Sequence, residues 1–394
     1  MNLLLAFLSR DWAGLAIAIG TALIGTWALS ADAVMAGWTI LACAGALAAG
    51  SMVHLQRRAS VRRRFPPPGK RVDVGGYCMH VLAEGDARGQ ATVVWLPGGH
   101  AGGSHLHHLH DRLRTSTRSV LVDRPGTGWS DTGPFPRTTR RETAEVMMAL
   151  EIAGERPPFL LAGHSFGGLL AANIARAYPD RVSCVALIDA TPPDTIIYGP
   201  RHPALKQMRR SAWIMGLTSL FGLDLKLFER AADSDPVGRT LNDVIAACLG
   251  RHREAVRAAE RNPGAFFAAA SIFQELSPEG MARAAWDIGV YDGDLDHMPV
   301  LLVAPADMVE LEANLQQLTG DGAIAARIQR IYARSRERYM ATSRQARRIA
   351  SPPGTGHNFP FEAPDFLADV IREAASAHTA CATPGHSPRM KTTA

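Results

Sequence analysis

Two long apolar segments stand at the start of the chain. Residues 12–29 and 33–53 contain no charged side chain, and only Ser30, Ala31 and Asp32 separate them. Each is about as long as a helix must be to cross a hydrocarbon layer of roughly 30 Å. Tryptophans, which favour the membrane interface, stand near the ends of the segments: Trp12, Trp27 and Trp38. The pattern predicts a hairpin of two transmembrane helices.

A basic stretch follows the second apolar segment. Residues 57–71 contain no acidic side chain. Their basic residues are Arg57, Arg58, Arg62, Arg63, Arg64, Lys70 and Arg71. Because positive residues stay on the cytoplasmic side, two crossings place the rest of the chain in the cytoplasm, at the cell membrane. Two alternatives remain open: a single span, which puts the domain on the other side, and a cleaved signal peptide with residues 12–29 as its apolar core.

The hydrophobic pattern changes after a proline-rich linker at residues 65–69. Short, near-continuous apolar runs then recur, separated by helix-like stretches such as 138–153 and 167–178. The runs are residues 92–97, 119–123, 159–163, 184–190 and 299–304. Uninterrupted apolar runs are typical of parallel strands covered on both faces. The alternation predicts a doubly wound, mostly parallel α/β domain.

The last two runs are separated by far more chain than one crossover needs. Residues 194–297 are rich in helix formers and are expected to form an inserted helical lid. The predicted organisation is therefore a hairpin and basic segment over 1–64, a hydrolase-like domain over 65–376, and a disordered tail over 377–394.

Composition narrows the function classes. Hydrophobic residues make up 47% of the chain and charged residues 20%, a balance that excludes a disordered protein. The net charge of +5 has its main source in the stretch beside the hairpin, so no nucleic-acid partner is expected. The five cysteines are odd in number and widely spaced, which excludes a disulfide framework and a structural zinc site and favours a reducing compartment.

A candidate nucleophile follows the run at 159–163. Gly163-His164-Ser165-Phe166-Gly167 has the form G-x-S-x-G, with an apolar strand before it and a helical run after it. That context is the one in which a sharp strand-to-helix turn presents a serine hydroxyl. The alternative is a glycine-rich turn with an ordinary serine.

An oxyanion hole is expected beside this serine. The apolar run at 92–97 ends at Gly98 and Gly99, where backbone can approach a substrate oxygen closely. The predicted donors are the amides of Gly99 and Phe166. The alternative is a plain strand-to-loop turn.

His357 is the candidate general base. It lies in a glycine-rich loop late in the chain, so it follows the serine in the order found in α/β-hydrolases. Two aspartates could complete the triad, because each follows a predicted buried strand. Asp307 follows the run at 299–304 and is preferred, while Asp189, at the end of the run at 184–190, is the alternative.

A second group of histidines follows the oxyanion segment. It consists of His100, His105, His107, His108 and His110. Metal binding is one interpretation, but the spacing lacks the carboxylate-backed pair of known zinc motifs. A helix that brings some histidines near the pocket is preferred, and neither a metal nor a cofactor is predicted.

These motifs together resemble the alpha/beta hydrolase-1 family. The resemblance rests on DRPGTGWSD at 123–131, PPFLLAGHSFGG at 157–168 and GTGHNFPFEAPDFLADVI at 354–371, and it covers most of residues 72–376 except the lid. It implies a triad of Ser165, His357 and a late aspartate, with no cofactor. The sequence departs from the family at Pro97-Gly98, where the family usually has His-Gly.

The sequence therefore predicts a membrane-anchored serine hydrolase, an enzyme that cleaves an ester or related acyl bond through an acyl-enzyme on Ser165. The membrane anchor suggests a small-molecule ester or acyl substrate that could be lipid-like. Alternatives on the same triad are a prolyl-type aminopeptidase and an acyltransferase. A non-catalytic binding protein of the same fold is the alternative of another class.

Overall fold

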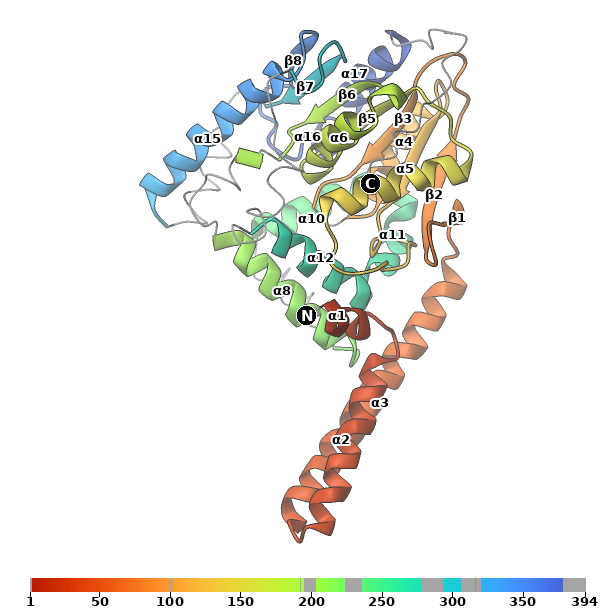
Figure 1. Ribbon diagram of the computed structural model, residues 1–394, viewed down its shortest axis with the longest axis vertical. Coiled ribbons are helices and arrows are strands. Elements are labelled where there is room, and N and C mark those ends of the chain that lie inside the picture. The colour runs from red at the N-terminus through yellow and green to blue at the C-terminus, as the bar shows by residue number, and fades with distance from the viewer. Residues whose placement is uncertain are drawn as a thin grey trace, which may run out of the picture.

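The computed structural model describes residues 2–99, 101–191, 193–194, 203–223, 236–277, 293–305, 316 and 320–377. Its centre is a sheet of eight strands in the order β1-β2-β4-β3-β5-β6-β7-β8 (Figure 1). The strands are β1 (Lys70–Asp73), β2 (Cys78–Glu84), β3 (Thr92–Leu96), β4 (Ser119–Asp123), β5 (Phe159–His164), β6 (Val182–Ile188), β7 (Val300–Ala304) and β8 (Ala346–Ala350). Strand β2 is antiparallel to β1 and β4. The other strands, β4, β3, β5, β6, β7 and β8 in sheet order, are all parallel to one another.

The five apolar runs predicted from the sequence are strands β3 to β7, so the doubly wound α/β prediction is confirmed. The sequence pattern did not indicate β1, β2 or β8. Strands β1 and β8 lie at the two edges of the sheet and have exposed positions, two of which in β8 are Arg347 and Arg348. Because most side chains of β1 and β8 are at least partly exposed, these strands carry no continuous apolar run in the sequence.

Helices cover both faces of the sheet. On one face α5 (Thr139–Ala153), α6 (Phe166–Ala177) and Tyr339 of α15 (Gly322–Ala341) join the strand side chains in one core. On the other face α4 (His107–Leu113) and α17 (Pro364–Ala377) form a second core with Trp95 and Leu160. This three-layer arrangement places the carboxyl ends of β3, β5 and β6 together at one edge, where loops can meet.

The chain between β6 and β7 forms a helical insertion. Its described helices are α8 (Pro203–Ser219), α10 (Pro236–Leu249), η3 (Gly250–His252), α11 (Arg253–Glu260) and α12 (Pro263–Glu275). Asn262 caps the start of α12, because its side-chain oxygen accepts a hydrogen bond from Ala265 N at 2.8 Å. Pro263 is the first residue of the helix. Helix α12 packs lengthwise against α8, as expected for a helical lid.

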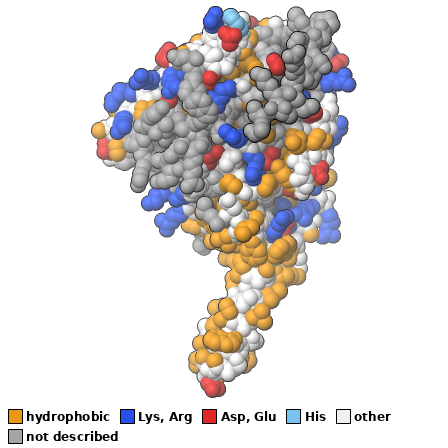
Figure 2. Space-filling view, in the orientation of Figure 1, with side chains coloured by type: hydrophobic (Ala, Val, Ile, Leu, Met, Phe, Trp, Pro, Cys, Tyr) orange, Lys and Arg blue, Asp and Glu red, His pale blue; other side chains and the backbone are white. Residues whose placement is uncertain are grey.

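The N-terminal segment forms α1 (Asn2–Leu8), α2 (Ala13–Ser30) and α3 (Val34–Arg64). Helices α2 and α3 pack as an antiparallel hairpin that projects from the body (Figure 1), and its outer surface is apolar (Figure 2). By length and composition both are apolar enough to cross a membrane. The arginines of the basic stretch from Arg57 to Arg64, here called the arginine stretch, form the last turns of α3, whereas Lys70 and Arg71 belong to β1. The sequence did not predict that α3 continues through these arginines. The tail was predicted over 377–394; Ala377 is the last residue of α17 (Pro364–Ala377), and 378–394 lie outside the described residues.

Candidate active site

Ser165 occupies the turn between β5 and α6. Its backbone has φ 53° and ψ −120°, a left-handed conformation that is unusual and strained for a residue with a side chain. The turn is held on both sides, since Ser165 N donates to Ile188 O at 3.0 Å and Ser165 O accepts from Gly168 N at 2.9 Å. The hydroxyl Oγ lies 3.4 Å from Thr191 Oγ1. A strained strand-to-helix turn of this kind is the geometry expected of a nucleophile elbow.

The glycines around Ser165 are required by close backbone packing. A Cβ on Gly167 would collide with the carbonyl oxygen of Leu96 at the end of β3, and one on Gly163 would collide with Gly167 O. Helix α6 can therefore start directly against the sheet. Since Ser165 directly precedes α6, the positive end of the helix dipole lies beside this residue.

His357 and Asp189 meet at the carboxyl edge of the sheet. His357 Nδ1 lies 2.7 Å from Asp189 Oδ2, and Asp189 directly follows β6. Asp189 also has a positive φ of 37°, and its amide donates to Val303 O at 2.7 Å. Asp307, the acid preferred from the sequence, lies outside the described residues. Of the two candidate acids, the structure brings the alternative, Asp189, onto the imidazole.

Asp189 is a buried carboxylate with a basic side chain on each of its oxygens. Its Oδ1 accepts from Arg336 Nη2 at 2.8 Å, while Oδ2 faces His357. Burial raises the pKa of Asp189, but the hydrogen bonds and charges of His357 and Arg336 outweigh burial and lower that pKa to about 2. The group is therefore ionised at neutral pH, as needed to orient and stabilise an imidazolium.

His164, the x before the serine, fixes the position of the His357 loop. Its Nε2 lies 2.9 Å from the carbonyl oxygen of His357, so this nitrogen carries the hydrogen and donates it. Burial and the nearby His357 lower the pKa of His164 to about 3, so the ring is neutral. Sequence reasoning treated His164 only as a variable position of the motif, and nothing in the local pattern predicts a contact across 193 residues.

Gly99 and Phe166, the predicted oxyanion donors, are both connected to Arg124. Gly99 has φ +52°, a left-handed conformation that glycine adopts without strain, and its carbonyl accepts from Arg124 Nη2 at 2.7 Å. The same guanidinium lies 4.9 Å from the centre of the Phe166 ring and donates to the buried Glu142 at 2.9 Å. Arg124 belongs to the DRPGTGWSD motif, one of those on which the family resemblance rests. The motif did not indicate that this arginine contacts Gly99 and Phe166.

The insertion also contacts the segment after Gly99, the predicted oxyanion loop. Glu260, the last residue of α11, accepts from Gly102 N at 2.9 Å and lies 2.6 Å from His105 Nε2. Burial lowers the pKa of His105, but the charge and hydrogen bond of Glu260 outweigh burial and raise it. The charged pair therefore connects the lid to the loop beside the serine.

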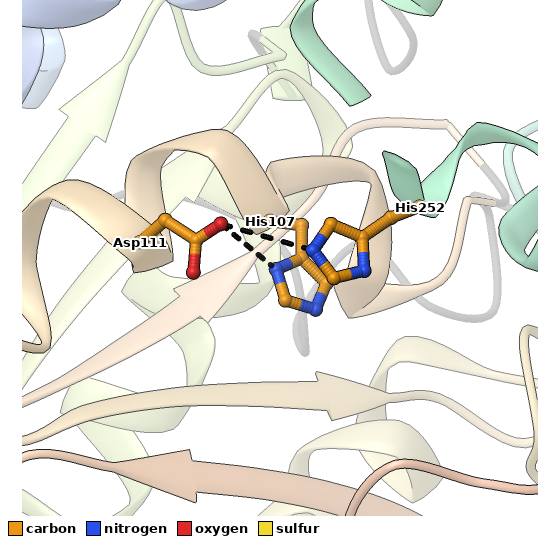
Figure 3. A group of neighbouring side chains, drawn as sticks. All are labelled: His107, Asp111 and His252. Atoms are coloured by element: carbon orange, nitrogen blue, oxygen red, sulfur yellow. Dashed lines mark ion pairs between the residues drawn. The ribbon is translucent and has the colours of Figure 1, made fainter. Parts of the chain in front are cut away.

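One histidine of the candidate metal group, His107 of α4, lies beside two residues that the sequence did not include in that group, Asp111 and His252. His107 and His252 stack with ring centres 3.7 Å apart, and one nitrogen of each lies 3.8 Å from Asp111 Oδ2 (Figure 3). His252 Nε2, however, accepts a hydrogen bond from Arg251 at 3.1 Å, and Asp111 Oδ1 accepts from Arg114 at 2.8 Å.

Two features make this cluster a poor metal site. A metal ligand must direct its lone pair at the ion in the plane of its ring, which two parallel rings at an interplanar angle of 12° cannot both do. Neighbouring arginines also disfavour a dication. Burial, His252 and His110 lower the pKa of His107 to about 4, and burial also lowers the pKa of His252, so the two rings stack without charge and hold η3 against α4. His100 lies outside the described residues.

Comparison with known proteins agrees with this geometry. Residues 93–370, more than half of the chain, match the model of the alpha/beta hydrolase family, so the protein belongs to this family. The matched span contains Ser165, Asp189 and His357.

Curated relatives match only in part. The (lyso)-N-acylphosphatidylethanolamine lipase of Bos taurus is 33% identical over 138 residues, which are 33% of this chain and 38% of the relative. The uncharacterized protein YbdG of Bacillus subtilis is 29% identical over 120 residues, 30% of this chain and 36% of that protein. The matched segments span little more than a third of either relative.

Solved structures share the fold at low identity. A thermophilic esterase from Thermogutta terrifontis superposes with a TM-score of 0.52 and 18% identity, over 79% of this chain and all of that one. The esterase EaEST from Exiguobacterium antarcticum gives 0.50 and 13%, over 78% and 99%. These similarities establish the shared fold alone.

Proposed function

We propose that this protein is a serine hydrolase that cleaves carboxylic esters or related acyl bonds. Ser165 is the nucleophile, His357 the general base and Asp189 the acid of its triad, in place of the Asp307 preferred from sequence. The observation that carries the proposal is the serine elbow at the end of β5 together with the 2.7 Å contact between His357 Nδ1 and Asp189. Such an arrangement, in a family of hydrolases, favours acyl transfer over passive binding.

The reaction follows from these groups. Ser165 Oγ attacks the carbonyl carbon while its proton passes to His357 Nε2, and Asp189 stabilises the imidazolium through Nδ1–H. The Gly99 and Phe166 amides donate to the developing oxyanion. The carbon–oxygen bond to the alcohol then breaks, the alcohol leaves with the proton from His357, and an acyl-enzyme remains. Water, deprotonated by His357, releases the acid and regenerates Ser165.

We further propose that the hairpin anchors the enzyme in a membrane. In the apolar windows of α2 and α3 only 28% and 17% of residues are buried, whereas a core helix of a soluble protein would be mostly buried. Ile19, Leu23 and Trp27 on α2 are more than half exposed. The arginine stretch on the body side supports a cytoplasmic catalytic domain. An enzyme held there would meet lipid-like esters, the class named in the lipase relative.

The test is a comparison of the full-length protein, in detergent, with Ser165→Ala on p-nitrophenyl esters of several chain lengths. Loss of one serine nucleophile is expected to lower kcat by about 10⁴-fold or more. Ser183→Ala is the matched control, because Ser183 lies at the start of β6, at the end of the strand opposite to Asp189, and its hydroxyl donates to the backbone oxygen of Phe159 at 3.3 Å. Equal rates in Ser165→Ala and the parent would remove Ser165 as the nucleophile, and no turnover by folded parent protein would favour a non-catalytic binding role.

A further inference from the structure

The end of α8 lies in a notch at the base of the hairpin. A Cβ on Gly14 of α2 would lie 2.5 Å from Leu220 O, and one on Gly50 of α3 would lie 2.5 Å from Phe221 O. The two glycines leave room for the turn that follows α8, and Arg57 donates to Gly222 O at 3.5 Å. The insertion therefore contacts the backbone of both hairpin helices.

An apolar cluster fills this junction. Leu5 and Leu8 of α1, Ala13 of α2, Leu220 after α8 and Phe267 of α12 are all buried together. Asp11, between α1 and α2, fixes the same corner through Arg58 at 3.3 Å and Arg62 at 2.7 Å, both on α3. The hairpin is thus continuous with the packing of the insertion.

Helix α12 connects the junction to the candidate active site. Phe267, near its start, belongs to the junction cluster, while Ile272 and Leu276 at its other end pack on Phe166 and Leu169 of α6. Glu275 accepts from Thr139 N at 2.8 Å, which fixes α12 to the body. The residue after the proposed nucleophile therefore packs on the helix that also contacts the base of the hairpin.

The outer side of this junction is apolar. Leu3 and Leu4 of α1 are 88% and 51% exposed, and Ile214 and Leu217, in the last two turns of α8, are 45% and 41% exposed. Leu223, just beyond, is also exposed. Figure 2 shows hydrophobic surface that continues from the hairpin onto the underside of the body, with basic side chains around it. Exposed basic residues in the neighbouring chain are Arg10, which follows α1, Arg63 on α3, and Lys206 and Arg210 in the first two turns of α8.

We propose that α1 and the last two turns of α8 form a docking surface for an anionic lipid bilayer, through which the insertion receives ester substrates that reside in that bilayer. This inference rests on the proposed function. The apolar face continues the exposed surface of the two helices that are long and apolar enough to span a membrane, and this continuity points to a bilayer as the occupant. Apolar side chains with basic residues beside them are the combination that binds anionic membrane surfaces.

The test uses the full-length protein in lipid nanodiscs. Ile214→Asp/Leu217→Asp introduces charge on the proposed surface. Met148→Asp/Ile152→Asp is the matched control, because these α5 side chains are 45% and 50% exposed on the body. Hydrogen exchange of the α8 amides is measured in detergent, in phosphatidylcholine discs and in discs that also contain phosphatidylglycerol. The hydrolysis of a long-chain ester dissolved in the bilayer is measured relative to that of a short, water-soluble ester.

We expect the anionic discs to slow exchange in α8 of the parent and of the control variant, and less so in the Ile214/Leu217 variant. The ratio of bilayer-borne to soluble ester hydrolysis should fall about tenfold in that variant, because it loses two interfacial apolar side chains. Equal α8 exchange in detergent and discs, or equal behaviour of the two variants, would overturn the docking surface. Equal protection in neutral discs would overturn its preference for anionic lipid. Failure of the proposed function is distinct: no ester is then hydrolysed in a Ser165-dependent way, although exchange still reports docking.

Discussion

At the scale of single residues, the candidate site depends on contacts between side chains far apart in the chain. Ser165 and His357 could be predicted because each lies in a local motif. The acid could not, because Asp189 and Asp307 both follow buried strands and only the folded chain shows which carboxylate reaches the imidazole. Asp189 is the one that the described structure places there, with Arg336 on its other oxygen.

Asp189→Asn is expected to lower kcat/KM by about 10³–10⁴-fold, because the amide cannot stabilise the imidazolium and favours the wrong tautomer. Asp307→Asn is the matched variant and should stay within about threefold of the parent if Asp189 is the acid. Steady-state ester hydrolysis by both variants measures this difference. The reverse result, with the large loss in Asp307→Asn, would assign the acid to the segment after β7.

His105 and Glu260 give the contact between the insertion and the oxyanion loop a pH dependence. The folded pKa of His105 is raised above its usual value, so the stabilisation is fully present below the unfolded pKa of about 6.5 and is lost as pH rises through the folded pKa. We expect amide exchange of residues 101–106 to accelerate, relative to the intrinsic rate, as pH rises through that range. Glu260→Gln should remove this dependence, and the same pH dependence in that variant would show that another group is responsible.

At the scale of secondary structure, near-continuous apolar runs predicted the central strands, while the edge strands lacked that signal because their side chains are partly exposed. The contact between the hairpin and the insertion could not be predicted from the sequence either. Gly14 and Gly50 look like ordinary small residues of an apolar helix, and only the position of the 219–223 turn shows that their lack of a side chain is needed.

Gly50→Ala is expected to destabilise the junction by about 1–3 kcal/mol, because its Cβ would overlap the backbone of Phe221. Gly45→Ala on the same helix is the control, since a Cβ there meets nothing within 4 Å. Alanine should stabilise that helix position by up to about 1 kcal/mol. Thermal unfolding and limited proteolysis of the insertion, both in detergent, compare the two. Equal stability of the variants would argue against the notch.

At the scale of the whole molecule, the described structure packs the hairpin against the insertion of the domain that follows it. The sequence predicted a hairpin over 1–64 and an independent domain from residue 65, and those boundaries stay a prediction. The fold itself agrees with the family and its inserted helices. The junction cluster, however, makes the hairpin a structural support of the insertion as well as the proposed anchor.

Deletion of residues 1–64 is therefore expected to impair the enzyme even toward soluble esters. It would expose Leu220 and Phe267, both fully buried, and remove the support of α12 that reaches Phe166. Leu220→Ala in the full chain should reproduce part of the loss, at about 2–4 kcal/mol of stability. Ester kinetics and size-exclusion chromatography report both effects. A monomeric truncated protein with unchanged kcat/KM would show that the hairpin only localises the enzyme.

The most direct test of the central claim is covalent labelling of the full-length protein with a fluorophosphonate, followed by peptide mass spectrometry. If Ser165 is an activated nucleophile, one adduct forms on the peptide that contains it, and His357→Ala slows labelling by orders of magnitude. A folded protein that stays unlabelled, or an adduct on another residue with Ser165 unmodified, would contradict the account.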